Sequence, residues 1–596
     1  MAQSSPMSLR PLKPQTKRQK FLCFDIESKK TETTHEINTE FLMLGVTEDG
    51  VNVPIYTDID DFVHNHFTRR NEGAIFYAFH GGRYDFQFLI EPLIRAGYRL
   101  DVLPGSGRIV MMNARKGKHY WRIWDFGQVV QGSLAKNLKA FNTMHQKLDD
   151  VDRADLTDTP ETRRYLAHDV LGLWDLIVAF YAQEELSGVG HAPTASSLAL
   201  RMFRTRFMTL PIPSLSLDKE AFVRRGLHGG RTEVLRYQGK HVREYDVHAM
   251  YVWAMTQPLP FGKGTWVHGW QERHVGFYEA EVTSPADLLI PILPVREDKL
   301  RFKLGAFTGV WYSEELKLAS RMGYKIRIIK GLVFRPVYLT KEYAELCYAM
   351  RRYGDVRKAL AKILGNGLFG KFSQSRDKRM VANVSQKEAK DHAYDLAYAP
   401  LNLFWVPTHS DSPHILPHIG AAITSLARVK LYSALSAVSD HACYCDTDSV
   451  FTCCDTALPA NLVGDGLGQF GLEKEYDELR ANLPKLYALS YRDDAGEVQY
   501  KVRAKGFPSR IAIANVEAIL HGKSFDAEWW DVGTLQALMR SPSDDRRTGS
   551  GLTGEIRRRR TVQSVDDKRI WGQDGETYPH GFKGNPVSAR VREHDA

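Results

Sequence analysis

The sequence predicts a multidomain protein that combines α/β and α+β folds. Its 596 residues exceed the usual size of one domain, and a hydrophobic content of 43% suffices for several buried cores. Between residues 21 and 187, strand-like runs such as FLCFDIES and AIFYAF alternate with helix-like runs such as TRRYLAHDVLGLWDLIVAFY, a pattern typical of α/β domains. Further along, VREYDVHAMYVWAM is interpreted as a strand, 341–369 as two helical pieces broken at Gly354, and 442–452 as strand, turn and strand.

The charge balance favours a polyanionic partner. The chain has 80 basic and 71 acidic residues, and its net charge is +9. Residues 1–20 contain no acid and five basic residues, so we expect a disordered basic arm, with a mitochondrial transit peptide as the alternative. Beyond Pro508 the chain becomes polar, and the run Arg557 to Arg560 suggests a basic appendage. No apolar run approaches the ~18 residues of a membrane span, so no membrane partner is expected.

Six cysteines in so long a chain indicate a reducing compartment. Four of them cluster in the sequence, at Cys443, Cys445, Cys453 and Cys454. Because Cys443 and Cys445 lack the two-to-four-residue gap of a zinc knuckle, we do not expect a zinc site.

The most informative segment is CYCDTDSVF, in which Asp446 and Asp448 lie two residues apart within an apolar strand pair. The period of a strand places both carboxylates on one face, where they repel each other unless cations neutralise them. Asp246, in REYDVHAMY, supplies a third carboxylate. Three carboxylates are what two divalent ions need to hold a phosphoryl group during its transfer.

A helix-like segment, DVRKALAKILGNGLFGKF, supplies cations for phosphate. Lys358, Lys362 and Asn366 are spaced by four residues and share one face, and Arg351 lies two turns earlier. A solvated basic face is the alternative. The segment also resembles a phosphate-binding loop, but Phe372 replaces the required hydroxyl and a helix precedes the loop, which excludes an ATPase of that kind.

A second set of acids lies near the start of the chain. FDIES places Asp25 and Glu27 on one face of a strand, Asp85 follows in HGGRYDFQFL, and Asp169 lies in YLAHDV one helical turn after Tyr165. Such acids can hold two metal ions that activate water for phosphodiester hydrolysis, with the Tyr165 hydroxyl orienting the water.

In their order along the chain these segments resemble the motifs of family B DNA polymerases. FDIES, RYDF and YLAHD are similar to the three exonuclease motifs, and DVHAMY, KILGNGLFG and YCDTDS are similar to polymerase motifs A, B and C. LPKLYALSY and AKGFP resemble the K-x-Y motif and the lysine after it in the protein-primed polymerases of phages and linear plasmids. The resemblance covers residues 21 to about 508.

The resemblance implies an RNase H-like 3′-5′ exonuclease domain followed by a right-hand polymerase with palm, fingers and thumb. The implied divisions are a basic arm (1–20), the exonuclease domain (21–187), palm (188–257), a terminal-protein-contacting insertion (258–337), fingers (338–372), a processivity insertion (373–416), palm (417–508), and thumb with C-terminal tail (509–596).

It also implies roles for individual residues. The metal-holding catalytic carboxylates are Asp246, Asp446 and Asp448 in the polymerase and Asp25, Glu27, Asp85 and Asp169 in the exonuclease, where Tyr165 is also catalytic. Residues expected at the nucleotide are Tyr251 as the steric gate against ribonucleotides, Phe369 at the nascent base pair, and Lys358, Lys362, Asn366 and Arg351. Residues expected at DNA are Ser28, Ser133, Leu134, Gly370, Lys371, Lys485, Tyr487 and Lys505.

The implied cofactors are two Mg²⁺ or Mn²⁺ ions per active site. The implied partners are a DNA template-primer, dNTPs and a terminal protein, and we expect a monomer located in the host cytoplasm, or in a mitochondrion if a linear plasmid encodes it.

The chain departs from the family pattern at several positions. Ala249, Met250 and Val252 replace the Ser, Leu and Pro of motif A, and Gly81 occupies the place of an Asn that holds the single strand. Leu227, Gly367 and Phe369 replace a Tyr, a Ser and a Tyr. Since no metal-binding carboxylate is missing, both activities are expected, with an altered grip on the substrates.

Three other functions stay open from the sequence. A primer-independent or repair polymerase of the same fold would start synthesis without a protein primer. A non-catalytic DNA-binding clamp would be unaffected by loss of Asp446 and Asp448. A nuclease without polymerase activity is disfavoured by the intact YCDTDS segment.

Overall fold

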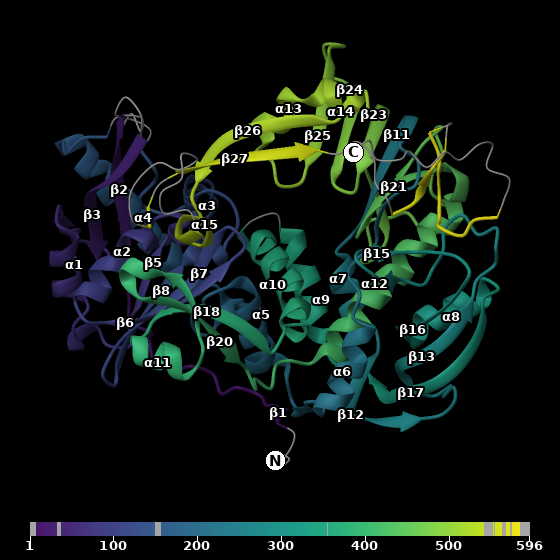
Figure 1. Ribbon diagram of the computed structural model, residues 1–596, viewed down its shortest axis with the longest axis horizontal. Helices are drawn as coiled ribbons and strands as arrows, with labels where there is room; N and C mark the ends of the chain where they lie inside the picture. Colours follow the sequence, from purple (N-terminus) through teal and green to yellow (C-terminus); the bar gives the residue numbers. More distant parts are fainter. Residues whose placement is uncertain are drawn as a thin grey trace.

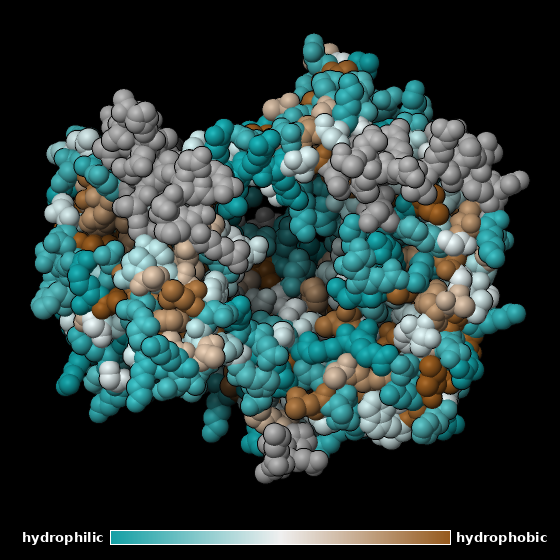
Figure 2. All heavy atoms as spheres, viewed as in Figure 1, coloured by the Kyte–Doolittle hydropathy of each residue, from teal (hydrophilic) through white to brown (hydrophobic). Residues whose placement is uncertain are grey.

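The computed structural model describes residues 7–32, 37–148, 156–353, 356–540, 552–553, 555–562, 568–572 and 575–583. Its elements surround a central opening (Figure 1), and the space-filling view shows this face of the molecule hollowed at its centre (Figure 2). The predicted combination of α/β and α+β parts is confirmed by two large mixed and antiparallel sheets with helices packed on them.

The N-terminal domain is built on a ten-stranded sheet in the order β19-β20-β18-β6-β7-β8-β5-β2-β3-β4, in which β2, β5 and β8 are parallel. Its strands from this part of the chain are β2 (Phe21–Glu32), β3 (Ile37–Thr47), β4 (Ile55–Tyr56), β5 (Ile75–Ala78), β6 (Arg99–Gly105), β7 (Arg108–Lys116) and β8 (His119–Asp125). The helices are α1 (Ile59–His66), α2 (Asp85–Arg95), α3 (Leu134–Ala140) and α4 (Pro160–Tyr181).

The side chains of β2 point alternately to the two faces of the sheet, and the core of this domain accordingly has two layers. Phe21 and Cys23 belong to the apolar cluster that includes α4, whereas Leu22, Phe24 and Ile26 belong to the cluster that includes α2. Because successive side chains of a strand point to opposite faces, the odd-numbered residues that follow Cys23 continue toward α4.

The segment expected to be a processivity insertion extends the same sheet beyond β6. It consists of β18 (Asp377–Asn383), α11 (Gln386–Asp391), β19 (Asp395–Tyr398) and β20 (Leu403–His409). Val381 and Ala382 of β18 pair with Val102 and Asp101 of β6. The Asn383 side chain stabilises the pairing of β18 with β6. It accepts a hydrogen bond from the Leu100 amide at 2.6 Å and donates one to the Tyr98 carbonyl at 2.9 Å.

The expectation of a disordered basic arm is wrong for residues 7–20, and residues 1–6 lie outside the described part of the chain. Strand β1 (Ser8–Leu9) pairs with β9 (Ile212–Pro213), and Leu9 is fully buried in the main apolar cluster. The Leu12 amide also donates to the Arg204 carbonyl at 2.8 Å. The basic side chains stay outside, while the backbone and one apolar residue fasten the segment to the rest of the molecule.

The central sheet has seven strands in the order β10-β21-β22-β11-β23-β24-β25. They are β10 (Thr232–Val234), β11 (Gln238–Val247), β21 (Ala442–Asp446), β22 (Ser449–Thr452), β23 (Phe470–Leu483), β24 (Leu486–Arg492) and β25 (Val498–Ala504). The neighbouring helices are α5 (Ala195–Met202), α6 (Leu217–Arg225), α7 (Met250–Met255), α9 (Lys341–Met350), α10 (Val356–Phe372) and α12 (Pro417–Val438).

The prediction of one strand over VREYDVHAMYVWAM is correct only for the first part of this segment. The strand ends at Val247, and Ala249 adopts the left-handed region with a φ of 56° before α7 begins. This conformation turns the chain sharply, so that Asp246 lies at the end of the strand instead of in its middle.

Two smaller parts complete the fold. A four-stranded sheet in the order β12-β17-β13-β16 occupies the region of the expected terminal-protein insertion. The sheet consists of β12 (Leu259–Val267), β13 (Val275–Thr283), β16 (Ala306–Tyr312) and β17 (Lys325–Val337). The same region contains α8 (Ser313–Arg321) and a separate pair of strands, β14 (Val295–Arg296) and β15 (Leu300–Arg301). The C-terminal part contains α13 (Ser509–Ala514), α14 (Val516–Leu520), β26 (Phe525–Val532), α15 (Leu535–Arg540), β27 (Glu555–Val562), β28 (Ile570–Trp571) and β29 (Thr577–Tyr578).

The ribbon of β26 and β27 bridges the central opening and reaches the N-terminal domain (Figure 1). Leu535, Met539 and Leu552 join the apolar cluster that includes α2, and the Gln87 side chain donates to the Gly533 carbonyl at 3.0 Å. Among the described residues, no helix has the length and apolar character that crossing a membrane requires.

Candidate active sites

The acids of the N-terminal domain converge where β2 faces α4. Asp25 and Glu27 continue the face of β2 that carries Cys23, and Asp169 projects from α4. Carboxylate oxygens of these three residues all lie within 4.8 Å of one another. Asp85 is the first residue of α2, and its charge acts on Asp25. The structure therefore brings together the acids that the sequence separates by up to 144 positions (169 minus 25).

Burial raises the pKa of Asp25 well above its usual range, and the charges of Asp85, Glu27 and Asp169 raise it further. Burial likewise raises the pKa of Asp85, with added repulsion from Glu27 and Asp125. One oxygen of Asp169, Oδ1, is buried and has no hydrogen-bonding partner in the described part of the chain. These acids are buried, they repel one another, and they include this Asp169 oxygen. A hard divalent cation prefers such a set of oxygen donors.

Lys147 joins this site, and sequence reasoning missed it. Its Nζ contacts Oδ2 of Asp169 and lies 4.7 Å from the centre of the Tyr165 ring. Burial lowers the pKa of Lys147, but the Asp169 and Tyr165 interactions outweigh burial and raise it overall. A single lysine in a polar loop gives no sequence signal of its own.

Tyr165 lies on the same face of α4 as Asp169, as its spacing predicts. Burial raises the pKa of Tyr165 to about 12. The hydroxyl therefore stays protonated at neutral pH and can donate a hydrogen bond.

Asp125, at the end of β8, holds the loop that leads to Asp85. Its side chain is fully buried, and Oδ1 accepts hydrogen bonds from the His80 amide at 2.8 Å and the Gly127 amide at 2.9 Å. At Gly81 an added Cβ would lie 2.6 Å from the Cβ of Ala78 and 2.8 Å from the Phe86 ring. The family's Asn cannot enter this loop without moving it, which gives the departure at Gly81 a structural cause.

The residues expected along the single-strand path lie on the edges of this site. The Ser28 hydroxyl is 2.8 Å from the Tyr84 hydroxyl, next to Asp85. Ser133 is exposed and caps α3 by accepting from the Lys136 amide, and Leu134 is the first residue of that helix. The loop before α3 is tied to the loop before α2, because His80 Nε2 lies 3.0 Å from the Gly132 carbonyl oxygen.

The acids of the central sheet meet at the end of three strands. Asp246, at the end of β11, is in register with Ser449 of β22 and Gly471 of β23. The Val247 amide donates to the Asp448 carbonyl at 2.8 Å, and Asp446 ends β21. The turn between Asp446 and Asp448 is fixed by Thr447, whose φ is 64°. The predicted set of three carboxylates therefore shares one edge of the sheet.

Burial raises the pKa of Asp246 to about 7, and the Asp448, Glu473 and Glu244 charges contribute. Burial also raises the pKa of Asp448, the charge of Asp446 adds to the rise, and the charges of Lys485 and Lys362 oppose it. Oδ1 of Asp246 is buried without a hydrogen-bonding partner among the described residues. These oxygens, like those of the first site, fit divalent metal ions.

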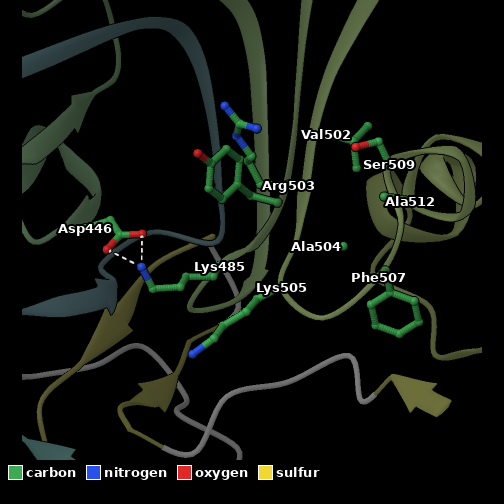
Figure 3. A pocket seen from close by; sticks show the side chains of 10 residues that line it. Asp446, Lys485, Val502, Arg503, Ala504, Lys505, Phe507, Ser509 and Ala512 are labelled. Carbon is green, nitrogen blue, oxygen red and sulfur yellow. Dashed lines mark hydrogen bonds and ion pairs between the residues drawn. The ribbon is translucent and has the colours of Figure 1, made fainter. Parts of the chain in front are cut away.

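Beside this edge, a cavity of about 320 Å³ is lined by Asp446 and by three residues expected at DNA, Lys485, Tyr487 and Lys505. Figure 3 shows Asp446, Lys485 and Lys505 at this cavity. The Lys485 Nζ lies 2.8 Å from both oxygens of Asp446. The backbone ties the two lysines together, since the Lys505 amide donates to the Lys485 carbonyl at 2.9 Å. The cavity thus places cationic side chains next to Asp446.

Helix α10 presents the expected phosphate-binding face. Lys358, Lys362 and Asn366 are exposed on it, and the charge of Lys362 acts on Asp448. Arg351 lies in the 3₁₀ turn after α9. The Tyr251 ring of α7 stacks on the Phe369 ring of α10, with centroids 4.0 Å apart and planes 18° apart. The two residues expected at the nucleotide's sugar and base are therefore in direct contact.

Lys371, after Gly370, lies away from this face. Its Nζ donates to the Ser197 hydroxyl at 3.1 Å, and burial lowers the pKa of Lys371 to about 8, with Lys378 adding repulsion. It lines a second cavity, of about 390 Å³, with the basic residues Arg122 and Arg201. This cavity lies between the N-terminal domain and α5.

The Gly-rich segment from Gly226 to Gly230 packs against the turn that carries the acids. A Cβ at Gly230 would lie 2.8 Å from Thr447, and the Thr447 amide donates to the Arg231 carbonyl at 2.7 Å. Arg428 of α12, which sequence reasoning missed, is buried and donates to the carbonyls of His228 and Gly229 at 2.6 and 2.8 Å.

Close packing also explains the departure at Gly367, as it does at Gly81. A Cβ there would lie 3.1 Å from the Ala195 carbonyl oxygen, the Cα of Ser196 and the Cβ of Ala199, because α10 crosses closely over α5.

The four arginines of the expected basic appendage are mostly engaged within the C-terminal part itself. Arg557 and Arg559 pair with Glu528 at 2.5 and 3.6 Å, and Arg558 pairs with Asp531 at 3.0 Å. Arg560 donates to the Lys505 carbonyl at 3.0 Å. The antiparallel pairing of β26 and β27 sets Glu528 opposite Arg559, whereas Asp531 is opposite Ile556 and reaches Arg558 diagonally. The run therefore contributes less free charge than its sequence suggests.

We expect metal affinity at the central-sheet site to fall as the pH falls through about 7. The pKa of Asp246 is raised, so its proton must leave before a cation binds, and each pH unit below that pKa costs about tenfold in affinity. Manganese titration followed by electron paramagnetic resonance, in a variant with Asp25→Ala and Glu27→Ala, isolates this site. The variant Asp246→Asn should lose the pH dependence, and a flat profile in its parent would contradict the assignment.

Three comparisons with known proteins agree with this geometry. A family model described as DNA polymerase type B, organellar and viral, matches residues 149–400. A probable DNA polymerase of Neurospora intermedia is 25% identical over 386 residues, which are 59% of this chain and 40% of that protein. The DNA polymerase of Bacillus phage phi29 is 26% identical over 328 residues, which are 49% of this chain and 52% of the phage protein.

A solved structure of the phi29 DNA polymerase complexed with primer-template DNA superposes with a TM-score of 0.71 and 19% identity. The superposition covers 92% of this chain and 100% of that chain. In sequence, the chain spans about a third to about half of the length of the curated relatives it matches. The matched family model, the shared fold and the order of the six motifs all make this chain similar to the DNA polymerases of type B, organellar and viral.

Proposed function

We propose that this chain is a DNA-directed DNA polymerase with a 3′-5′ proofreading exonuclease, which replicates a linear viral or plasmid genome from a protein primer. The convergence of Asp246, Asp446 and Asp448 at one sheet edge, beside the cationic cavity of Lys485, is the observation that carries the proposal. The separate acid cluster of Asp25, Glu27 and Asp169 supports the second activity.

Both sites are proposed to hold two Mg²⁺ or Mn²⁺ ions. Asp246, Asp446 and Asp448 would hold them in the polymerase site, and Asp25, Glu27, Asp85 and Asp169 in the exonuclease site. Bound ions supply activation of the attacking 3′-hydroxyl or water and neutralise the charge that develops on the leaving oxygen.

The other residues position the substrates. Lys362, whose charge acts on Asp448, would bind the triphosphate of the incoming dNTP together with Lys358, Asn366 and Arg351. In the exonuclease site the protonated Tyr165 would donate a hydrogen bond to the attacking water, and Lys147 would keep Asp169 in place.

The proposed partners follow from the resemblance and from the related complexes. The phi29 polymerase has been solved with primer-template DNA and with incoming nucleotide substrates, and we propose the same ligands here. A terminal protein would contact the four-stranded sheet of β12, β13, β16 and β17. The compartment would follow the genome: the host cytoplasm for a virus, or a mitochondrion for a linear plasmid.

Primer extension tests the whole proposal. A primed template and an unprimed template are each incubated with Mg²⁺ and dNTPs, with and without a candidate terminal protein. Extension of the primer, with unprimed synthesis only when the protein is added, supports protein priming. Unprimed synthesis by the enzyme alone indicates a primer-independent polymerase, and no extension at all favours a non-catalytic clamp.

Tyr251→Ala should relax sugar selection. The Tyr251 ring is held by its stack on Phe369 and would occupy the space of a 2′-hydroxyl, so its loss should reduce discrimination against ribonucleotides by on the order of 10²-fold. Single-nucleotide incorporation with dCTP and CTP measures the ratio. Tyr251→Phe keeps the ring and should keep the selection, and an unchanged ratio in Tyr251→Ala would refute the gate role.

A further inference from the structure

The end of the β21–β22 hairpin opposite to Asp446 and Asp448 gathers a cluster of metal-ligating side chains, His441, Cys453, Cys454 and Cys443. Hairpin pairing brings them together, since Ala442 pairs with Thr452 and the Cys453 amide donates to the His441 carbonyl at 2.8 Å. Residues that flank the hairpin on its two strands are thus neighbours, although ten or more positions separate them in the sequence.

The geometry of three of these side chains fits one tetrahedral ion. A nitrogen of His441 and the Sγ atoms of Cys453 and Cys454 all lie within 4.8 Å of one another, and the two sulfur atoms are 3.6 Å apart. Zinc–sulfur bonds of about 2.3 Å in a tetrahedron place two sulfur ligands about 3.8 Å apart.

The backbone conformation that places Cys454 in this position is strained. Cys454 and Asp455 have φ values of 55° and 62°, two consecutive left-handed residues that are not glycine. The Cys454 amide donates to the Lys240 carbonyl at 2.9 Å, and the Asp455 amide donates to the His241 carbonyl at 3.1 Å. Strain of this kind persists where the surroundings enforce it, and it often marks a functional site.

Cys443 lies beside this group without belonging to it, because its Sγ is not among the ligand atoms that lie within 4.8 Å of one another. A Cβ at Gly239 would lie 2.8 Å from the Cys443 Sγ and 3.0 Å from the Cys453 Cβ. All six cysteines of the chain are free thiols. One histidine and two thiols supply three of the four ligands that zinc takes in a tetrahedral site, which leaves one position for water.

We propose that His441, Cys453 and Cys454 bind one Zn²⁺ ion, with water in the fourth position, and that this ion fastens the base of the hairpin carrying Asp446 and Asp448. The site does not depend on the proposed polymerase reaction, because its ligands lie at the end of β21 and β22 remote from the proposed catalytic carboxylates. The expectation of no zinc site rested on the spacing of Cys443 and Cys445, and neither of these residues belongs to the set of three ligands.

Metal content of the full-length protein, produced with added zinc, tests the site. We expect one equivalent of zinc per chain in the wild type and in Cys347→Ala, a control at a buried cysteine of α9. Cys454→Ala and His441→Ala should each lose most of the zinc; both residues are exposed, so neither change should prevent folding. Zinc absent from the wild type, or retained equally by both variants, would overturn the proposal.

Cobalt provides a second measurement that distinguishes thiolate ligands from the carboxylate sites. Co²⁺ bound at the cluster should give a sulfur-to-cobalt charge-transfer band that Cys454→Ala weakens and that Cys347→Ala and Asp446→Asn leave unchanged. Alkylation of the denatured protein without a reductant, followed by mass spectrometry, checks the competing chemistry, because five of the six cysteines are buried in the folded chain. Six alkylated cysteines after zinc removal are expected, whereas a disulfide within the cluster would contradict the metal site.

Discussion

Replacing Asp446 and Asp448 together with Asn should reduce nucleotide incorporation by at least about 10³-fold while single-strand degradation continues. The two acids are two of the three carboxylates expected to hold the metal ions. The charge stabilisation that bound ions supply amounts to several kcal/mol, and each 1.36 kcal/mol is tenfold in rate. Single-turnover extension of a labelled primer at saturating dNTP measures the chemical step.

The design needs a control for the loss of negative charge. Asp477→Asn removes an exposed carboxylate from β23 of the same sheet and should leave extension unchanged. Thermal unfolding of the double variant separates a catalytic defect from a folding defect. Because burial and repulsion raise the pKa of Asp448, loss of these charges should not destabilise the metal-free protein. Normal extension by the double variant would remove the basis of the polymerase proposal.

The carboxylate sets could be predicted from the sequence because each has a local signature. Asp25 with Glu27 follows the period of a strand, and Tyr165 with Asp169 follows that of a helix. The strand period that was expected to place Asp446 and Asp448 on one face does not hold, because β21 ends at Asp446 and the two acids are brought together by the turn at Thr447. The resemblance implied that Tyr251 and Phe369 both lie at the nucleotide, but it did not predict that their rings stack, and no spacing connects the two residues.

Other features depend on contacts between distant segments and leave no local signal. Lys147 and Asp125 are single residues whose roles come from the fold around Asp169 and Asp85. The pairing of β18 with β6 joins segments more than 270 residues apart, as the register of Val381 with Val102 shows. In each case the segment that gives the residue or strand its role can be identified only once the topology is known.

The basic segments show a second limit of prediction from sequence. Charge composition predicted a disordered arm and a basic appendage, yet Leu9 is buried in a core and Arg557 pairs with Glu528. Composition gives the number of charges but not which basic residues lie beside an acid on a paired strand. The position of Glu528 opposite Arg559 becomes apparent only from the antiparallel register.

Asp25→Ala combined with Glu27→Ala should abolish degradation of single-stranded DNA and leave primer extension within about twofold of the wild type. The two residues supply two of the three carboxylates that lie within 4.8 Å of one another, and the remaining Asp169 is paired with Lys147. Without them a water-activating metal pair cannot be held, and the expected loss is on the order of 10³-fold or more. Release of labelled nucleotides from a single-stranded oligonucleotide measures the hydrolysis.

Because the two carboxylate clusters are separate, both possible outcomes of this experiment are informative. Glu40→Ala, on the neighbouring strand β3, removes an exposed acid that pairs with Lys29 and should leave both activities intact. The double variant should also misincorporate more often, because mismatched primer ends are no longer removed, and sequencing of extended products measures this. Loss of extension together with degradation would mean that the acids of β2 and those of β11 and β21 serve one site, against the separate clusters that the fold places on two different sheets.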